Sequence, residues 1–253
     1  MATGKESTTT RRERLAQERA AQAASERRRR RLLTVLGGVV VVALVVGVGI
    51  AVQVSRNDTT SATLPATVTA AGGPIVRNPG VSNVPVLDYW EDFQCPICKQ
   101  MEDSSGDAVR ALVASGSVVV NYHMLSFLDG KVHNDSSRRS ANAFACSAAS
   151  GTQGAYHDTV FAHQPAQEGG GYTDAQLLQF GQDVGITGDA FTMFSGCVSG
   201  LTYGDYVTSV ETAGAQQGIT GTPTVFLNGT KLDNAVAFDP AALTKAVNAA
   251  SAG

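Results

Sequence analysis

The sequence predicts an α/β domain that contains an inserted block of helices and follows a single N-terminal transmembrane helix. Three observations predict this: an uncharged run over residues 32–53, a strand–helix–strand pattern over 84–125, and a return to strands after a long stretch, about 135–217, with helix signals only. The 253 residues are 43% hydrophobic and 16% charged, a composition that excludes collagen-like, mucin-like and wholly disordered chains.

The charge of the chain is divided between two unlike pieces. The formal net charge is −3, but ten of the 19 basic residues and only four acidic ones fall in residues 1–31, which leaves +6 there and −9 for the rest. The uncharged segment 32–53 follows five consecutive arginines and exceeds the roughly 20 residues that cross a bilayer core. We therefore expect a basic cytoplasmic tail, a single membrane-spanning helix and an extracytoplasmic domain at the cell membrane.

A cleaved signal peptide is the alternative for the same segment. The apolar part of such a peptide typically has about 7–15 residues and ends at small residues, whereas this run is longer and is followed by Gln-Val-Ser-Arg. The uncleaved signal-anchor is therefore favoured, and both alternatives export the rest of the chain. Residues 54–80, rich in Thr, Ala, Gly and Pro, are expected to form a flexible linker before a folded domain over 81–253.

The elements of this domain follow from its apolar patterns. Residues 84–90 form a short β-leaning run, 99–115 are compatible with a helix, and 117–125 form a second strand, so together they predict a βαβ unit. Within the helical stretch, Thr173 and Gln176 have the spacing of a capping box.

Strands return near the C-terminus. The sequence TVFLNGTKL places Asn228-Gly229 between two extended runs, which is typical of a type I′ hairpin. Asp239 and Pro240 suit the N-cap and first position of a last helix. The order of βαβ, helical block and ββα is that of a thioredoxin-like fold with a helical insertion at about 135–217.

The motif Cys95-Pro96-Ile97-Cys98 carries the strongest chemical signal. Two cysteines one helical turn apart at a strand-to-helix junction can form a small disulfide ring that opens easily. At a helix N-terminus, the free N–H groups and the dipole stabilise a Cys95 thiolate and lower its pKa from about 8.5. Pro96 suits the first turn because it lacks an N–H, and Cys98 is placed to resolve a mixed disulfide.

Half of a zinc site is the alternative for this motif. The other two cysteines are isolated, and the histidines, at positions 123, 133, 157 and 163, lack the close spacing of zinc ligands. His157 and His163 are expected on a polar helix face. Redox chemistry is therefore favoured, and no metal is expected.

The remaining cysteines are Cys146 and Cys197. All four lie in the exported part, where disulfides persist, and of the three possible pairings the close spacing of Cys95 and Cys98 favours the one that leaves Cys146 with Cys197. That bridge closes a loop of about 52 residues and is worth about 4 kcal/mol in the chain-entropy model. A structural disulfide is favoured over a second redox pair because neither cysteine has a close partner.

A second motif, Thr222-Pro223, immediately precedes the strand at 224. Such a proline marks a turn or a cis bond at a strand start, and the residues alone favour a plain strand-start proline because only about 5–6% of X–Pro bonds are cis. The two segments WEDFQCPIC (90–98) and GTPTVFLNG (221–229) together resemble the DsbA-like branch of exported thiol:disulfide oxidoreductases, and the order of elements is similar over 81–251.

This resemblance implies that the bond before Pro223 is cis and lies against the active disulfide, and that Thr222 contacts substrate through its backbone. It implies no cofactor other than the redox-active disulfide. Ile97 replaces the histidine that stabilises the thiolate in DsbA. Such folds also often bury a carboxylate six residues before the first cysteine, where this chain has Tyr89; the nearby Asp88 and Glu91 are expected to project differently.

The function predicted from these features is that of a membrane-anchored dithiol oxidase for reduced exported proteins. The resemblance implies reoxidation by a membrane quinone reductase of the DsbB-like or vitamin K epoxide reductase-like type; no nucleic-acid partner is expected. A reductase or isomerase with reversed electron flow is the first alternative. A non-enzymatic binding module on the same fold is the second.

Overall fold

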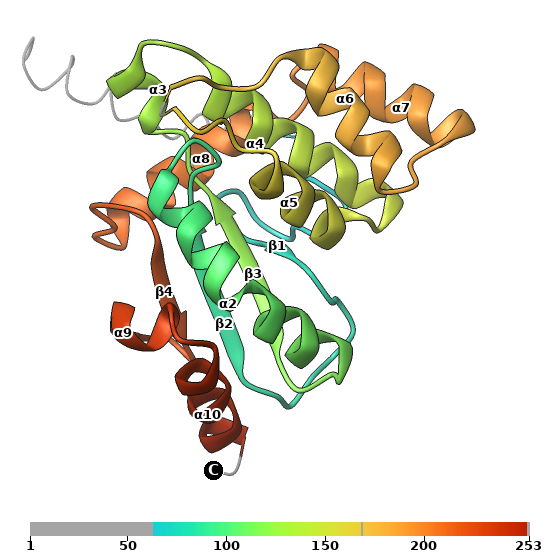
Figure 1. Ribbon diagram of the computed structural model, residues 1–253. Helices are drawn as coiled ribbons and strands as arrows, with labels where there is room; N and C mark the ends of the chain where they lie inside the picture. The colour runs from blue at the N-terminus through green and yellow to red at the C-terminus, as the bar shows by residue number, and fades with distance from the viewer. Residues whose placement is uncertain (1–62, 168, 252–253) are drawn as a thin grey trace, which may run out of the picture. The chain divides into compact units, whose positions relative to one another are not determined.

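The structure is a computed structural model that describes residues 63–251, except residue 168 (Figure 1). The predicted basic tail 1–31 and the predicted membrane helix 32–53 lie outside the described residues. Among the helices of the described part, none is long and apolar enough to cross a membrane.

A mixed sheet of five strands forms the centre of the domain, in the order β1-β3-β2-β4-β5. The central strand β2 runs parallel to β3 and antiparallel to β4, so that Tyr89 stands between Tyr122 and Val225. The strands are β1 (Ile75–Val76), β2 (Val86–Glu91), β3 (Val119–Met124), β4 (Thr224–Leu227) and β5 (Thr230–Lys231).

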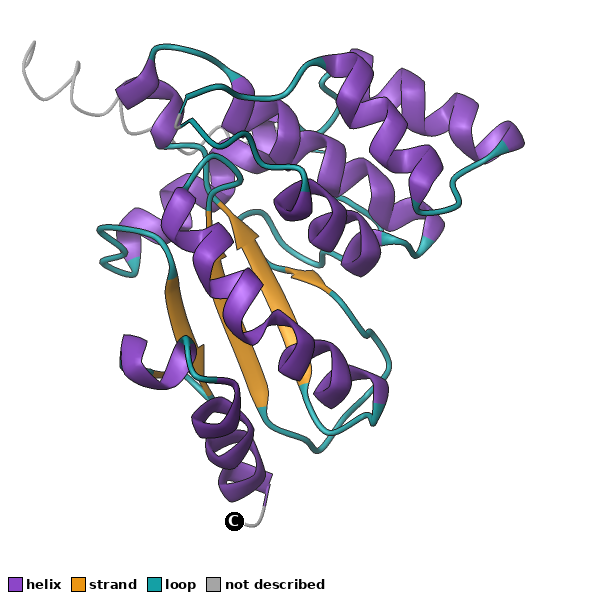
Figure 2. Ribbon diagram, viewed as in Figure 1, coloured by secondary structure: helices purple, strands orange, loops and turns teal. Residues whose placement is uncertain are grey.

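Helices cover the sheet and gather at one end of it (Figure 2). They are α2 (Pro96–Ala114), α3 (Leu128–Val132), α4 (Ser136–Ser147), the 3₁₀ turn η1 (Ala148–Ser150), α5 (Gln153–Ala162), α6 (Asp174–Asp183), α7 (Gly188–Ser199), α8 (Gly204–Gln216), α9 (Asn234–Ala237) and α10 (Pro240–Ser251). Helix α2 crosses the front of the sheet in Figure 1, and α10 packs beside it.

Successive residues of β2 point to opposite faces of the sheet, as the period of a strand requires. Trp90 faces α8, where Gly214 lies so close that an added Cβ would stand 3.1 Å from the indole ring. Glu91 faces the other side, where its carboxylate lies 2.9 Å from His157 of α5, and Tyr89 shares this face because it is two residues away on the strand. The two faces of β2 therefore contact different helices.

The order of elements confirms the predicted α/β thioredoxin-like fold with a helical insertion. The predicted hairpin is present, with Asn228 and Gly229 at φ values of 48° and 75° between β4 and β5. Thr173 and Gln176 form the predicted capping box at the start of α6.

The sheet also extends into the segment expected to be a linker, 54–80. Ile75 and Val76 form β1, which pairs antiparallel with β3, and Ile75 is buried. Arg77, the next residue, forms a bidentate ion pair with Asp158 of α5 at 2.8 and 2.7 Å. A two-residue strand is too short to show a period in the sequence, so this part of the fold gave no signal.

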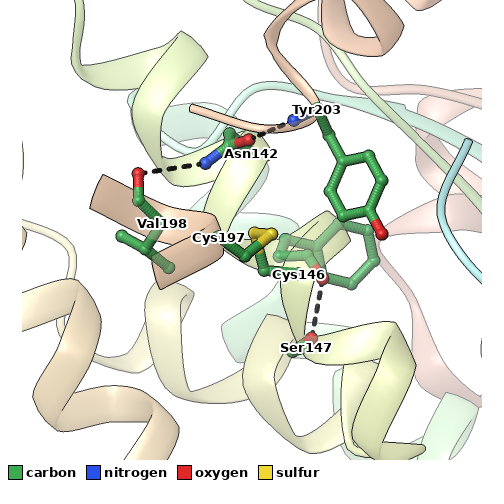
Figure 3. Close-up of a disulfide and its surroundings, with 7 residues drawn as sticks. Asn142, Cys146, Ser147, Cys197, Val198 and Tyr203 are labelled. Carbon is green, nitrogen blue, oxygen red and sulfur yellow. Dashed lines mark hydrogen bonds between the residues drawn. A yellow bond between two sulfur atoms is a disulfide. The ribbon is translucent and has the colours of Figure 1, made fainter. Parts of the chain in front are cut away.

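A disulfide joins two helices of the insertion, α4 and α7 (Figure 3). Cys146 and Cys197 have their Cα atoms 6.0 Å apart and are separated by 51 positions in the chain. Beside them, the buried Asn142 accepts a hydrogen bond from the Tyr203 N–H at 2.8 Å and donates one to the Val198 carbonyl at 3.5 Å. The disulfide and this amide fix the start of α8 and the end of α7 against α4.

Candidate active site

The cysteine pair lies at the N-terminus of α2, at the end of the central strand. Cys95 is the N-cap residue in extended conformation, and α2 begins at Pro96, whose missing N–H needs no partner there. The Cys95 carbonyl accepts a hydrogen bond from the Lys99 N–H at 3.2 Å, which starts the helical ladder. Cys95 and Cys98 are both free thiols, and Ile97 between them is 45% exposed.

The Thr222–Pro223 loop lies directly against Cys95. The peptide bond between Thr222 and Pro223 is cis, and the Cys95 sulfur is 3.5 Å from the Thr222 carbonyl oxygen. Only the thiol can donate to this oxygen, because the thiolate has no proton. The structure therefore brings together the two motifs, which are 127 positions apart in the chain.

The surroundings of Cys95 favour its thiolate. A hydrogen bond from the Cys98 thiol and the backbone N–H groups of Cys98 and Ile97 lower the pKa of Cys95 to about 6, against the effect of burial. These donors meet the sulfur at the positive end of α2. At pH 7 about nine-tenths of Cys95 is therefore thiolate.

The surroundings of Cys98 favour the neutral thiol. Cys98 is fully buried on α2, and burial, its hydrogen bond to Cys95 and the negative charge of Glu91 raise its pKa well above the ordinary value. Two identical side chains one turn apart thus differ in charge. Cys95 is a nucleophile, and Cys98 holds a proton.

Residues of the helical insertion hold the loop before Cys95, and the sequence gave no sign of them. Gln164, just after α5, donates its amide hydrogens to the carbonyls of Phe93 and Cys95 at 2.8 and 3.0 Å. The Tyr172 hydroxyl donates to the Phe93 carbonyl at 3.1 Å. The Phe93 and Cys95 carbonyls, which follow β2, thus receive hydrogen bonds from side chains of the insertion.

A buried carboxylate, Asp92, also supports this loop. Asp92 accepts hydrogen bonds from the Gln94 N–H, the Ser137 hydroxyl and the Leu128 N–H at 2.9, 2.6 and 3.2 Å. Burial raises the pKa of Asp92 to about 7 although these donors act against it. Asp92 therefore ties the loop to the starts of α3 and α4.

Two expectations about charged residues near β2 are wrong. His157 is fully buried rather than on a polar helix face, and its Nε2 atom lies 2.9 Å from Oε2 of the equally buried Glu91. Glu91 projects from the same face of β2 as Tyr89, because residues two apart on a strand share a face. His163, in contrast, is exposed.

Glu91, Glu102 and His157 form the only group in the described part that brings three potential metal-ligand atoms within 4.8 Å of one another. The sequence had suggested no histidine for such a site. His157 is, however, already engaged on both ring nitrogens, by Glu91 at 2.9 Å and by Asp158 at 3.4 Å. These three side chains therefore form a buried network of charged and polar groups.

A small cavity of about 240 Å³ adjoins the cis-proline loop. Leu125, Phe127 and Ile219 supply apolar walls, and Lys131 and Glu211 supply charges of both signs. Glu211 also accepts a hydrogen bond from the Ser126 N–H at 2.9 Å. This apolar hollow lies where the insertion meets the loop that carries Thr222.

Comparisons with known proteins agree with this geometry. Residues 79–249 match the family model described as Thioredoxin, and no curated protein matches the chain. The solved structure of reduced DsbG, a disulfide bond oxidoreductase from Mycobacterium tuberculosis, is 28% identical with a TM-score of 0.57, over 75% of this chain and 86% of that one. Oxidised DsbA of the same organism is 29% identical with a TM-score of 0.57, over 74% and 92%. MdbA from Actinomyces oris, a thiol-disulfide oxidoreductase, shares the fold at 22% identity and a TM-score of 0.64, over 75% and 93%.

Proposed function

The chain belongs to the thioredoxin family and is a thiol–disulfide oxidoreductase, and on this basis we propose that it is a dithiol oxidase that introduces disulfides into exported proteins. A substrate thiolate attacks the Cys95 sulfur of the Cys95–Cys98 disulfide and forms a mixed disulfide. A second substrate thiolate then attacks the substrate sulfur, which leaves the substrate oxidised and the enzyme reduced.

The observation that carries this proposal is the contrast between the two cysteines. A pKa of about 6 instead of 9.0 for Cys95 stabilises the reduced form at pH 7 by about 1.4 kcal/mol, a factor of about ten in the exchange equilibrium. Because a stable reduced form makes its disulfide a stronger oxidant, this difference favours transfer of electrons from substrate to enzyme. Because Cys98 is neutral at this pH, it places no second negative charge beside the Cys95 thiolate.

Substrate binding is assigned to the surface around the cis bond. The Thr222 backbone is available beside Cys95, Pro96 and the exposed Ile97 cover the start of α2, and the neighbouring hollow is apolar. An extended segment of a reduced protein could therefore pair with the Thr222 backbone while it places an apolar side chain in the hollow. This arrangement needs no cofactor other than the Cys95–Cys98 disulfide.

We also propose that the enzyme is anchored in the cell membrane. The uncharged run 32–53 after five arginines supports an anchor with a cytoplasmic N-terminus and an extracytoplasmic domain. A membrane quinone reductase, DsbB-like or vitamin K epoxide reductase-like, would return Cys95 and Cys98 to the disulfide. A reductase or isomerase fed by a membrane electron donor is the competing function.

Two measurements test the direction of electron flow. Free thiols are trapped in cells by acid quenching and alkylation, and the two redox states are resolved on a gel; we expect Cys95 and Cys98 mainly as a disulfide. The purified chain is also equilibrated with glutathione, against which it should be the stronger oxidant. A mainly reduced pair in cells would contradict the oxidase.

A Cys98→Ala variant provides the test against a non-enzymatic module. The remaining Cys95 should trap substrates as mixed disulfides, because no second thiol is left to release them. Cys95→Ser is the matched control and should trap none. Equal amounts of trapped protein in both variants would contradict a catalytic role for Cys95.

A further inference from the structure

Two acidic side chains and one histidine meet where β2, α2 and α5 come together. Glu91, at the end of β2, and His157 of α5 have no exposed surface, and Oε2 of Glu91 lies 2.9 Å from Nε2 of His157. Glu102 of α2 completes the group, because a potential ligand atom of each of the three residues lies within 4.8 Å of the other two. The exchange reaction as described above does not involve this group.

One carboxylate oxygen of Glu91 has no partner. Oε1 is buried and makes no hydrogen bond, although it belongs to the same carboxylate whose other oxygen contacts His157. A buried acceptor without a donor is costly, and a buried carboxylate is costlier still unless an opposite charge meets it. Oε1 is therefore an atom of this group that a bound cation would satisfy.

The arginines near the group are engaged elsewhere. Among the described residues, Arg77 and Arg110 both pair with Asp158, and the only basic residue that pairs with either acidic member of the group is His157. One protonated imidazole balances one carboxylate and leaves the other unbalanced. A divalent cation would balance both.

The other contacts of His157 suit a metal ligand. Its Nδ1 atom lies 3.4 Å from Oδ1 of Asp158, which is itself held by two hydrogen bonds from Arg77. A metal-bound histidine almost always donates its second ring N–H to a carboxylate, a carbonyl or water, which fixes the tautomer and the direction of the ring. The ring also stacks on Tyr122, with 3.9 Å between the ring centroids. Nε2 is therefore left as the ligand atom, directed towards Glu91.

A glycine in the middle of α2 makes room for the third ligand. A Cβ added at Gly106 would stand 3.0 Å from Oε2 of Glu102 and 3.1 Å from Nη1 of Arg110. Glycine is disfavoured inside a helix, and here the space that a larger residue would take is filled by the Glu102 carboxylate. Glu102 is also partly exposed, so its side chain provides a route by which an ion enters from solvent.

The donor set suits zinc better than calcium or magnesium. Calcium and magnesium take oxygen ligands, whereas an imidazole nitrogen with two carboxylates suits a divalent transition metal. Two atoms bound to one zinc ion are at most about 4.4 Å apart, because zinc–nitrogen and zinc–oxygen bonds are about 2.0–2.2 Å long. A group whose ligand atoms lie within 4.8 Å of one another therefore needs only small side-chain movements to bind the ion.

We propose that Glu91, Glu102 and His157 bind one zinc ion, which joins β2, α2 and α5. Nε2 of His157 and one oxygen of each carboxylate are the protein ligands, and a water molecule or the second oxygen of Glu91 takes the fourth position. The imidazole binds as the neutral form and the carboxylates as anions, so any protons they held are released to solvent and the ion balances both negative charges. Zinc thus fastens the helical insertion to the central strand and stabilises the folded chain.

Zinc binding is measured on the full-length chain, purified in detergent without a histidine tag. Metal is first removed with a chelator, and the chain is kept in the Cys95–Cys98 disulfide form so that these thiols do not bind zinc. After equilibrium dialysis against micromolar zinc chloride we expect one zinc ion per chain, together with a higher midpoint of thermal unfolding. Calcium chloride at the same concentration should leave the midpoint unchanged.

Three variants locate the ion. Glu102→Gln removes a ligand but keeps the size of the side chain, so its dissociation constant for zinc should rise at least tenfold. Asp103→Asn is the matched control, because it makes the same change of charge on the next residue of α2, whose exposed carboxylate binds Lys99; its affinity should stay within twofold of wild type. Gly106→Ala keeps all three ligands, but its Cβ displaces the Glu102 carboxylate and should weaken zinc binding at least threefold.

The proposal is overturned if the wild-type chain binds less than half an equivalent of zinc, or if Glu102→Gln weakens binding less than tenfold. The second result would place the ion on surface groups such as the exposed His133 and His163. If Glu102→Gln does not fold, Gly106→Ala decides, and a loss of affinity below threefold overturns the site. No exchange reaction is measured, so these results are independent of the proposed oxidase function.

Discussion

The low pKa of Cys95 gives the sharpest test of the site, because its largest cause is a single hydrogen bond. The Cys98 thiol is the first of the groups that stabilise the Cys95 thiolate. Cys98→Ala removes this donor, while Cys98→Ser replaces it with a hydroxyl of similar size. The pair of variants therefore separates the hydrogen bond from the helix terminus, which both of them keep.

The size of the effect follows from the strength of such a bond. A hydrogen bond to a charged group contributes about 1.5–3 kcal/mol, and 1.36 kcal/mol corresponds to one pKa unit. Cys98→Ala should therefore raise the pKa of Cys95 from about 6 to about 7–8. At pH 7 the thiolate fraction would fall from about nine-tenths to between one-tenth and one-half. Cys98→Ser should keep the pKa within half a unit of wild type.

Thiolate absorbance at 240 nm, recorded from pH 4 to 10, measures this pKa directly. The double variant Cys95→Ser/Cys98→Ala supplies the baseline, and alkylation by iodoacetamide at pH 7 gives an independent rate that follows the thiolate fraction. Equal midpoints for the alanine and serine variants would refute the reasoning. The helix N-terminus would then be the main source of the low pKa.

Three further predictions concern the insertion. Cys146→Ala/Cys197→Ala should lower the free energy of unfolding by about 2–4 kcal/mol in urea, because 51 positions separate the two cysteines, while exchange at the redox pair persists. Gln164→Ala leaves two carbonyls of the active-site loop without their hydrogen-bond donor. The free energy of unfolding should therefore fall by about 1–3 kcal/mol, and the loop should exchange its amide hydrogens faster. Arg77→Met should lower the free energy of unfolding by about 2 kcal/mol at pH 7. Arg77 and then His157 hold the pKa of Asp158 well below its usual range against the effect of burial, so this loss should shrink as the pH falls through that low value, which denaturation at pH 7 and pH 2 would check.

The sequence predicted the parts of this molecule that depend on neighbouring residues. The Cys95–Cys98 motif, the Asn228-Gly229 turn and the capping box at Thr173 each place a local requirement on the backbone, and the structure meets each of them. The order of strands and helices follows from local periods in the same way. A cis bond at Pro223 has no such local signal, and only the resemblance to a family indicated it.

The parts that sequence reasoning missed depend on contacts between distant segments. Helix α5 is buried on several sides, so its polar residues gave a false indication of an exposed face, and His157 meets a strand residue 66 positions earlier in the chain. Gln164 acts on carbonyls about 70 positions away, and no pattern marks an amide that serves loop carbonyls. Glu91 was misplaced for a simpler reason, because its two-residue spacing from Tyr89 already put both on one face.

These contacts make the insertion part of the redox site. Without α5, Glu91 would lose its contact with His157 and become a buried carboxylate without a partner, and burial of an unpaired charge costs several kcal/mol. A thioredoxin-like domain with a plain loop in place of the insertion would therefore need a different residue on β2 as well.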